Sequence, residues 1–295
     1  MARIGFIFAG QGAQYAGMGR GLAEKSPAAR TIFAEADRLL GYSISKLCFE
    51  GTLEDLTPCA VCQPAIFTVS MAAHAAYLEQ GGSAPSGCGG LSLGEFSAAC
   101  AAGVFSFETA LRLVALRGRL MDDCCQRNPG GMAAIIGGQT EEIQAVCAEC
   151  GIDVANYNCP GQIVISGPRD ALDRAVELLA PKCLRAVKLT VAGAYHSRLM
   201  NEAAERFAEA LATTEINAPA VPFAQNVPGT LVTSPEAIRD NLRRQVASSV
   251  RWEDCARALM PLCDSFAEFG PGNVLSGFMK RIDRRFPAAS AISLD

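Results

Sequence analysis

The chain has 295 residues, half of them apolar, and a formal net charge of -4. A chain of this length and composition can build one large core, or a large domain that carries a smaller one, without disulfide staples. The small net charge gives no general attraction for nucleic acid, so we expect no nucleic-acid partner, and any anionic ligand must meet a local basic patch.

The N-terminal stretch MARIGFIFAGQGAQ does not have the pattern of a targeting segment. Its one arginine and short apolar run lack the length and the cleavage site of a signal peptide. No apolar run reaches the roughly eighteen residues that a membrane-spanning helix requires. The sequence therefore predicts a cytoplasmic protein with no membrane partner.

Thirteen cysteines are scattered along the chain. Two CxxC pairs, Cys59/Cys62 and Cys147/Cys150, lack glycine-rich knuckles, and the second pair lies on a helical pattern. Buried, reduced thiols are favoured over the alternative of a zinc site. We expect no metal.

The first half of the chain predicts alternating strands and helices. Residues 3–10 are β-branched and aromatic and end in a glycine turn, which indicates a buried strand. Residues 26–41 and 63–82 indicate helices closed by glycine. Residues 106–125 indicate a further helix with Ser106 as its N-cap. This order predicts an α/β fold.

The order of the predicted strands and helices changes between residues 131 and 190. Six elements are predicted there, namely strand 131–138, helix 140–151, strand 152–158, strand 161–167, helix 168–181 and strand 184–190. The order β-α-β-β-α-β is that of the ferredoxin-like unit. It predicts an insertion in a larger α/β domain, which resumes near residue 194.

The clearest chemical signal is GLSLGEFSAACAAG, residues 90–103. Gly90, Ser92 and Gly94 satisfy G-x-S-x-G, in which a serine on a sharp strand-to-helix turn exposes its hydroxyl. A helix N-terminus at this serine would favour a developing oxyanion. The preceding residues 82–90 look loop-like, so a catalytic serine and a glycine motif for helix packing are equal alternatives at this point.

A nucleophilic serine needs a base, and the chain contains two histidines. His74 lies within a helix of small apolar residues, which indicates a structural or surface role. His196 follows the last strand of the predicted insertion, on a loop that re-enters the main domain, where sites are commonly built. His196 is therefore the preferred base.

Arg117 lies in the middle of an apolar helical stripe. Because a helix advances about 100° per residue, the stripe also contains Leu113, Leu116, Leu120 and Met121. A buried guanidinium needs an anionic partner. That partner is either an internal carboxylate or a substrate carboxylate held by two hydrogen bonds.

Seven stretches together resemble the malonyl-CoA:acyl-carrier-protein transacylase family of fatty-acid synthesis, which includes the acyltransferase domains of polyketide synthases. They are FAGQGAQYAGMG, GLSLGEFSA, LRGRLM, NYNCPGQIVISG, GAYHSRLM, RRQVASSVRW and FGPGNVLSGFMKRI, and they span nearly the whole chain in the family's order. The resemblance implies an α/β-hydrolase-like large domain, residues 1–127 and 194–295, with an inserted ferredoxin-like βαββαβ small domain, residues 128–193.

The resemblance also implies ping-pong acyl transfer without a cofactor. Ser92 would attack malonyl-CoA with His196 as base and release coenzyme A. The phosphopantetheine thiol of acyl carrier protein would then take the malonyl group as an extender unit for fatty-acid synthesis. Malonyl-CoA and acyl carrier protein are thus the expected partners, and a monomer is the expected state.

Further roles are implied by matching positions. The backbone N–H groups of Gln11 and Leu93 match the family's oxyanion hole. Arg117 matches the arginine that binds the malonyl carboxylate and selects it over acetyl. Gln245 matches the residue whose carbonyl orients the histidine in place of a triad acid.

Four pocket positions complete the resemblance. Met121 and Gln162 match pocket-lining residues. Leu91 stands where bacterial members commonly have histidine, so we expect an effect on substrate affinity more than on activity. Tyr195 stands where malonyl-selective members often have phenylalanine, and a bulky aromatic there should crowd an α-methyl branch.

Other functions can be weighed against this one. A dinucleotide enzyme is disfavoured because the third glycine of G-x-G-x-x-G falls on Tyr15. A discrete polyketide-synthase acyltransferase would use the same residues. A serine thioesterase or acyl hydrolase would share Ser92 and His196 but would not need Arg117 on a buried stripe. A docking module without catalysis would form no acyl-enzyme.

Local basic residues could receive an acidic carrier protein. The candidates are KRIDRR at 280–285 together with Arg243, Arg244 and Arg251. Solvated surface charge is the alternative for most of them.

Overall fold

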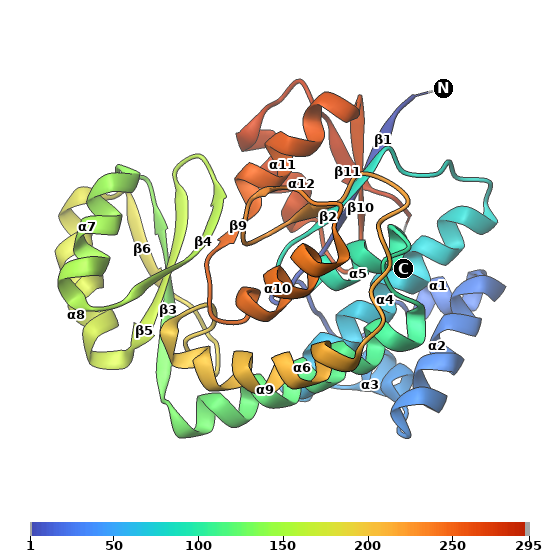
Figure 1. Cartoon of the computed structure of the whole chain (residues 1–295), viewed down its shortest axis with the longest axis horizontal. Coiled ribbons are helices and arrows are strands. Elements are labelled where there is room, and N and C mark those ends of the chain that lie inside the picture. The colour runs from blue at the N-terminus through green and yellow to red at the C-terminus, as the bar shows by residue number, and fades with distance from the viewer. Residues whose placement is uncertain (1, 293–295) are drawn as a thin grey trace.

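The computed structural model describes residues 2–292 and has the α/β architecture that the sequence predicts. Two separate sheets organise the chain, a parallel one in the larger part and a mostly antiparallel one in the smaller part. In Figure 1 the smaller part, with α7 and α8 on its outer side, lies to the left of the larger part.

The large sheet is parallel and buried. Its core strand contains Phe6, Ile7 and Phe8, which have no exposed surface, as expected for a strand covered on both faces. The strand order is β11-β10-β1-β2, with β1 at Ile4–Phe8, β2 at Gly87–Gly90, β10 at Ser265–Phe269 and β11 at Ala288–Ser290.

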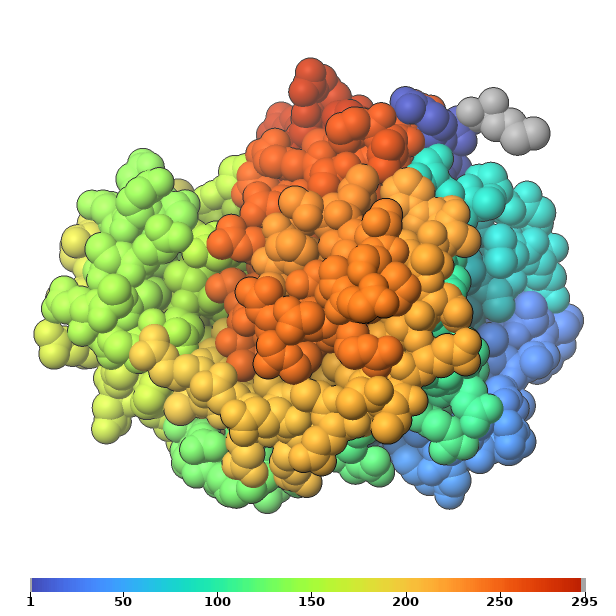
Figure 2. Space-filling model, viewed as in Figure 1, coloured from blue at the N-terminus to red at the C-terminus, as the bar shows by residue number. Residues whose placement is uncertain are grey.

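Helices surround this sheet. They are α1 (Arg20–Lys25), α2 (Pro27–Leu40), α3 (Ile44–Glu50), α4 (Cys59–Glu79), α5 (Gly94–Ala101), α6 (Phe107–Arg127), α9 (Asn201–Thr213), α10 (Pro235–Gln245), α11 (Trp252–Leu259) and α12 (Val274–Ile282). Short 3-10 turns lie at Ala180–Lys182, Arg198–Met200 and Met260–Leu262, and β7 (Ala224–Gln225) pairs with β8 (Thr230–Leu231). In Figure 2 the segment that contains α9 and α10 covers the front of the molecule beside the smaller part.

The predicted N-cap and one less obvious strand are both present. The Ser106 hydroxyl accepts a hydrogen bond from the Thr109 N–H at 3.1 Å and begins α6. The strand β2 has the sequence GCGG, so it carries no alternation of apolar side chains that would reveal it. It is fixed instead by backbone pairing with β1.

Helix α4 is longer than the sequence predicts. It begins at Cys59 rather than near residue 63, because Asp122 on α6 caps its first turn. The carboxylate accepts hydrogen bonds from the N–H of Cys59 at 3.0 Å and of Ala60 at 2.8 Å. By length and composition α4 could cross a membrane, contrary to the sequence prediction, but 78% of its most apolar window is buried inside the protein.

The small sheet is built by the predicted βαββαβ segment. The elements are β3 (Gly130–Ile136), α7 (Thr140–Cys150), β4 (Asp153–Cys159), β5 (Gln162–Pro168), α8 (Arg169–Leu179) and β6 (Arg185–Lys188). The order β6-β3-β5-β4 is antiparallel throughout, and the segment packs its own hydrophobic cluster. A fifth strand, β9 (Val250–Arg251), joins β4 from outside the predicted insertion.

Asp122→Ala should lower the free energy of unfolding by about 1–2 kcal/mol, because it removes the cap on α4. Urea denaturation would measure this loss. The control is Asp123→Ala. Within residues 2–292 the exposed Asp123 carboxylate pairs with Arg206 alone, at 3.4 Å, so its loss should stay below about 0.5 kcal/mol. Equal losses in the two variants would argue against the cap.

Candidate active site

Ser92 sits on a sharp turn between β2 and α5. Its φ of 51° lies in the left-handed region, which a residue with a side chain rarely adopts. The flanking glycines permit the turn, since a Cβ on Gly90 would lie 2.0 Å from Gly94 C and one on Gly94 would lie 2.1 Å from Phe8 O. This strained, glycine-flanked turn is the nucleophile elbow that the motif predicts.

The surrounding side chains hold the strained backbone of Ser92. Its N–H donates to Asn226 Oδ1 at 2.7 Å, and its carbonyl accepts from Gln245 Nε2 at 3.0 Å. Asn226 Nδ2 also donates to the carbonyl of Gly90 at 2.8 Å. Three hydrogen bonds therefore define the turn, and the role of Asn226 was not found from the sequence.

A buried carboxylate anchors this network. Glu95 has no exposed surface, and it accepts hydrogen bonds from the Asn226 N–H at 2.6 Å and from Gln225 Nε2 at 3.0 Å. Burial raises the pKa of Glu95 to about 7 against the lowering effect of these donors. Gln225 is fixed in turn by Asn241 Nδ2 at 2.9 Å, so each member of the network supports the next.

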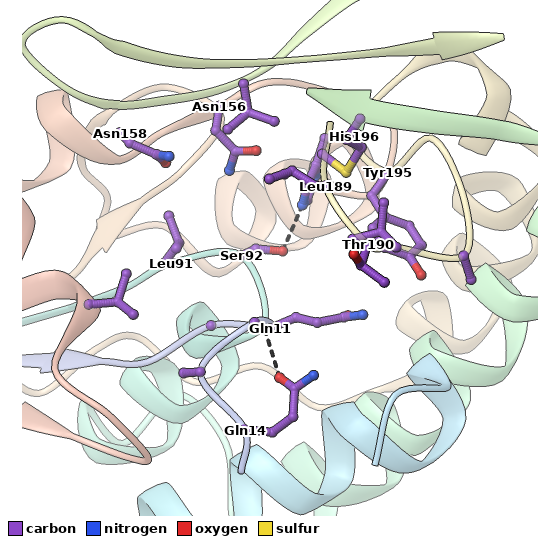
Figure 3. A pocket seen from close by; sticks show the side chains of 18 of the residues that line it. Gln11, Gln14, Leu91, Ser92, Asn156, Asn158, Leu189, Thr190, Tyr195 and His196 are labelled. Atoms are coloured by element: carbon purple, nitrogen blue, oxygen red, sulfur yellow. Dashed lines mark hydrogen bonds between the residues drawn. The ribbon is translucent and has the colours of Figure 1, made fainter. Parts of the chain in front are cut away.

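His196 meets Ser92 directly. Its Nε2 lies 2.7 Å from Ser92 Oγ, and its Nδ1 lies 2.9 Å from the backbone carbonyl of Gln245 (Figure 3 shows the first contact). Because a carbonyl only accepts, Nδ1 carries the proton and the Nε2 lone pair faces the serine hydroxyl. Burial, aided by the charge of Arg117, lowers the pKa of His196 to about 4, which keeps the imidazole neutral at pH 7.

The other histidine lies away from this site. His74 packs edge-on against Phe6, with ring centroids 5.6 Å apart, and against Phe269 at 5.5 Å. Its place in the aromatic core of the large sheet agrees with the structural role predicted from the helix around it.

Arg117 is buried beside the serine without an internal carboxylate partner. Its exposed fraction is 1%, and Nη1 donates to Gln63 Oε1 at 2.7 Å. Nη2 donates to Ser92 Oγ and to Gln245 Oε1, both at 3.1 Å. Among the ion pairs of residues 2–292 none includes Arg117.

The internal salt bridge that sequence reasoning left open is therefore not formed. Burial lowers the pKa of Arg117 to about 10, so the side chain is still a cation at pH 7. Its Nε is buried and makes no hydrogen bond in the described part of the chain. The Nε–H therefore remains an unused donor, whereas both hydrogens of Nη2 are engaged by Ser92 Oγ and Gln245 Oε1.

Gln63 is a site residue that the sequence did not reveal, since it lies in a helix interpreted as core. Its side chain is fully buried on α4. While Oε1 accepts from Arg117, Nε2 faces Met121 Sδ at 3.3 Å and Gln11 Oε1 at 3.4 Å. A glutamine amid the apolar residues of α4 was the available signal.

The two expected oxyanion donors come from two separate segments of the chain. Gln11 follows β1, and Leu93 is the N-cap residue of α5. Neither backbone N–H has a hydrogen-bond acceptor among the described residues. In Figure 3 the Gln11 side chain extends beneath Ser92. Two unpaired backbone donors beside a nucleophile suit a developing oxyanion.

A cavity of about 350 Å³ opens onto Ser92 and His196. Gln11, Leu91 and Met121 line it, as the sequence predicts for these positions. The buried Arg117 is not among the residues that line it, although it was predicted to bind substrate. Gln162 does not line it either, contrary to the prediction for that residue. Its Oε1 instead accepts from Arg281 Nη1 at 3.1 Å, because Arg281 on α12 reaches over to the β4–β5 turn.

Tyr195 forms part of the cavity wall next to His196. The Cys59 thiol donates to its hydroxyl at 3.0 Å, and burial raises the pKa of both groups. The phenol ring is thereby held in place. The described cysteines are all free, and no group of three or more His, Cys, Asp or Glu among residues 2–292 could hold a metal ion.

Most of the proposed basic docking residues are already paired. Arg243 and Arg244 meet Asp240, and Arg251 meets Asp254. Arg285 pairs with Asp283 at 2.6 Å. Arg243 and Arg244 share the one carboxylate of Asp240. Lys280, Arg281 and Arg284 form no ion pair within residues 2–292, so the docking role of this surface stays a prediction.

Comparisons with known proteins agree with this site. The family model described as "Acyl transferase domain" matches residues 5–281. A malonyl CoA-acyl carrier protein transacylase of Bacillus subtilis is 41% identical over 97% of this chain and 92% of its own length. An acyl carrier protein S-malonyltransferase structure from Vibrio cholerae is 38% identical with a TM-score of 0.93, covering 98% of this chain and 96% of that one.

A further solved structure contains a malonyl transacylase in complex with a type II polyketide synthase acyl carrier protein. It is 38% identical with a TM-score of 0.94, and the match covers 98% of this chain and 96% of that chain. The serine elbow, the neutral histidine and the full-length matches lead to one assignment: the chain belongs to the acyl transferase domain family.

Proposed function

We propose that this protein transfers a malonyl group from malonyl-CoA to the phosphopantetheine thiol of acyl carrier protein through a malonyl ester on Ser92. The observation that carries the proposal is the buried Arg117 cation, which touches Ser92 Oγ and forms no ion pair with a carboxylate of residues 2–292. A substrate carboxylate would supply the missing charge. The relatives named above as malonyl transacylases support the same substrate.

In the first half-reaction His196 Nε2 takes the proton of Ser92 Oγ, and Oγ attacks the thioester carbonyl. The backbone N–H groups of Gln11 and Leu93 receive the oxyanion. As the C–S bond breaks, His196 returns its proton to the sulfur of coenzyme A. The Gln245 carbonyl accepts from Nδ1 and stabilises the transient imidazolium, which explains why no triad carboxylate is required.

In the second half-reaction the carrier thiol replaces coenzyme A. His196 takes the thiol proton, sulfur attacks the malonyl ester, and Ser92 Oγ leaves with that proton. Arg117 would hold the malonyl carboxylate through Nε and Nη2 in both halves. Nη2 would exchange its hydrogen bond to Ser92 Oγ for one to the carboxylate, while Nη1 stays on Gln63.

Leu91 and Tyr195 would shape the acyl pocket. Leu91 offers no hydrogen bond to malonate, so the carboxylate depends on Arg117 alone for charge. Tyr195, held by Cys59, would crowd an α-methyl branch and favour malonyl over methylmalonyl.

The carrier is proposed to be that of fatty-acid synthesis. A polyketide carrier is the second candidate, favoured by the solved complex of a malonyl transacylase with a type II polyketide carrier. A serine hydrolase would use the same elbow, but it would leave the carboxylate-free Arg117 without a purpose.

The finer architecture belongs to the same proposal. An α/β-hydrolase-like domain would comprise residues 1–127 and 194–295, and residues 128–193 would form a ferredoxin-like insertion. The order β6-β3-β5-β4 and the separate hydrophobic cluster support the insertion, although β9 adds a strand to it. A cytoplasmic monomer that needs no cofactor completes the expected state.

Brief mixing with malonyl-CoA should add a malonyl group to the intact protein, detected by mass spectrometry. Ser92→Ala should abolish the adduct, because the nucleophile is removed. Acetyl-CoA should load poorly. Release of free coenzyme A without any adduct would favour a hydrolase, and neither product would favour a docking module.

Gln63→Glu should weaken malonyl loading by giving Arg117 a carboxylate partner in direct contact. The new carboxylate would lie where Oε1 is now 2.7 Å from Nη1 and form an internal ion pair. We expect kcat/KM for malonyl-CoA to fall about 30-fold, or about 2 kcal/mol, with the slow acetyl loading unchanged.

Gln63→Met is the matched control, since it removes the acceptor without adding charge. Its loss on malonyl-CoA should be smaller than that of Gln63→Glu. Equal losses on malonyl-CoA and acetyl-CoA would contradict a role through Arg117.

Ser92 acylation should stay rapid well below pH 6.5, because the neutral imidazole is the active base and the pKa of His196 is about 4. The rate should fall only as pH drops through that value, about tenfold per unit below it. Stopped-time labelling with an uncharged sulfonyl fluoride measures this profile without titration of the reagent. Because the pKa of Glu95 is about 7, a midpoint near pH 6.5 that persists in Glu95→Gln would show that burial does not control this histidine.

A further inference from the structure

The histidine at the site has a strained backbone. Among residues 2–292, Ser92 and His196 are the two residues other than glycine with a positive φ, 51° and 56°. A residue with a side chain adopts this left-handed conformation at a cost, and it persists where the surroundings hold it. Hydrogen bonds from Asn226 and Gln245 hold the turn of Ser92. A comparable restraint is therefore expected around His196.

The backbone of His196 sets the direction of its ring. Nε2 lies 2.7 Å from Ser92 Oγ, while Nδ1 lies 2.9 Å from the Gln245 carbonyl at the end of α10. Figure 3 shows the ring directed at Ser92, with Tyr195 beside it. Because the two partners lie on different elements, one orientation of the ring satisfies both. A relaxed backbone at His196 would lengthen one contact or both.

A serine side chain closes the turn that carries the histidine. Ser197 has no exposed surface, and its hydroxyl donates to the Ala194 carbonyl at 2.6 Å. The same oxygen accepts from the Leu199 N–H at 3.3 Å, so the hydroxyl is used both as donor and as acceptor. The bond from Ser197 to Ala194 spans His196. It therefore fixes the two ends of the segment between them.

The neighbouring side chains are fixed to other parts of the molecule. The Tyr195 hydroxyl accepts from the Cys59 thiol on α4 at 3.0 Å. The Arg198 N–H donates to Asp153 Oδ2 at 2.9 Å, and Arg198 Nη2 donates to Asp153 Oδ1 at 2.7 Å, at the start of β4. These contacts fix the position of the segment, whereas the Ser197 hydroxyl fixes its curvature.

We propose that Ser197 is a positioning residue for the general base. Its hydroxyl holds the turn from Ala194 to Ser197 so that His196 keeps the left-handed backbone and both ring contacts. Ser197 touches neither the substrate nor the reacting atoms, and it acts through the histidine alone. This inference rests on the proposed function, in which His196 is the base, and it names what keeps that base in place.

The time course of Ser92 labelling by an uncharged sulfonyl fluoride tests the proposal in Ser197→Ala. The rate constant reports the base, whereas the amplitude reports the fraction of folded protein. We expect the rate constant to fall roughly tenfold, because a misaligned base loses part of its effect. The kcat for Ser92 loading by malonyl-CoA should fall equally with KM unchanged, since Arg117 is untouched. A serine that only stabilises the fold would lower the amplitude and leave the rate constant at the parent value.

Ser197→Cys keeps the test valid if Ser197→Ala does not fold. A thiol is close in volume to the hydroxyl, but it is a weaker donor with a longer hydrogen bond, so the rate constant should fall about threefold. Ser166→Ala is the matched control. Ser166 on β5 is also fully buried, but its hydroxyl has no hydrogen bond to a described residue, so the parent rate constant should be kept.

An unchanged rate constant in folded Ser197→Ala, or in Ser197→Cys, would overturn the positioning role. An equal fall in Ser166→Ala would overturn it as well, because loss of any buried hydroxyl would then have the same effect. Failure of the parent protein to load malonyl from malonyl-CoA would instead overturn the proposed function. The labelling rate needs no malonyl substrate and would still test Ser197.

Discussion

The site depends on a cation that is buried without a carboxylate in direct contact among residues 2–292, since the buried Glu95 acts on Arg117 only from a distance. Bringing a guanidinium out of water is costly, and most buried arginines recover that cost through a carboxylate. Arg117 instead meets two glutamine carbonyls and the serine hydroxyl, which are neutral acceptors. Its charge therefore remains available to a substrate. Because the guanidinium is hydrogen-bonded to Ser92 Oγ, a substrate anion bound by Arg117 would lie next to the nucleophile.

The absence of a carboxylate beside His196 among residues 2–292 also explains why this histidine is neutral. Burial and the neighbouring Arg117 both disfavour the imidazolium, so His196 is held neutral and ready to accept a proton. A carboxylate on Nδ1 would raise that pKa and would also attract Arg117. The backbone carbonyl of Gln245 fixes the tautomer without a full charge. Gln245 thus serves both groups, since its side-chain oxygen accepts from Arg117 and its backbone oxygen from His196.

Structural support for the serine comes from a polar network rather than from the apolar core. Glu95, Gln225 and Asn226 are fully buried and connected to one another and to the Ser92 backbone. A fully satisfied network of this kind favours one arrangement because every alternative leaves a buried group unpaired. It can therefore hold a left-handed serine that costs about 1–3 kcal/mol by itself.

The sequence by itself determined the elements and the chemical types at the site. Hydrophobic periodicity located α6 and the βαββαβ segment, and the spacing of Gly90, Ser92 and Gly94 indicated the elbow because close backbone approach needs glycine. Periodicity also placed Arg117 on a buried stripe.

Only the tertiary structure decided which residues Arg117 contacts, since Gln63 and Gln245 are 54 and 128 residues away in the chain. It likewise brought Gln162 to Arg281, because contacts between distant segments leave no local pattern in the sequence.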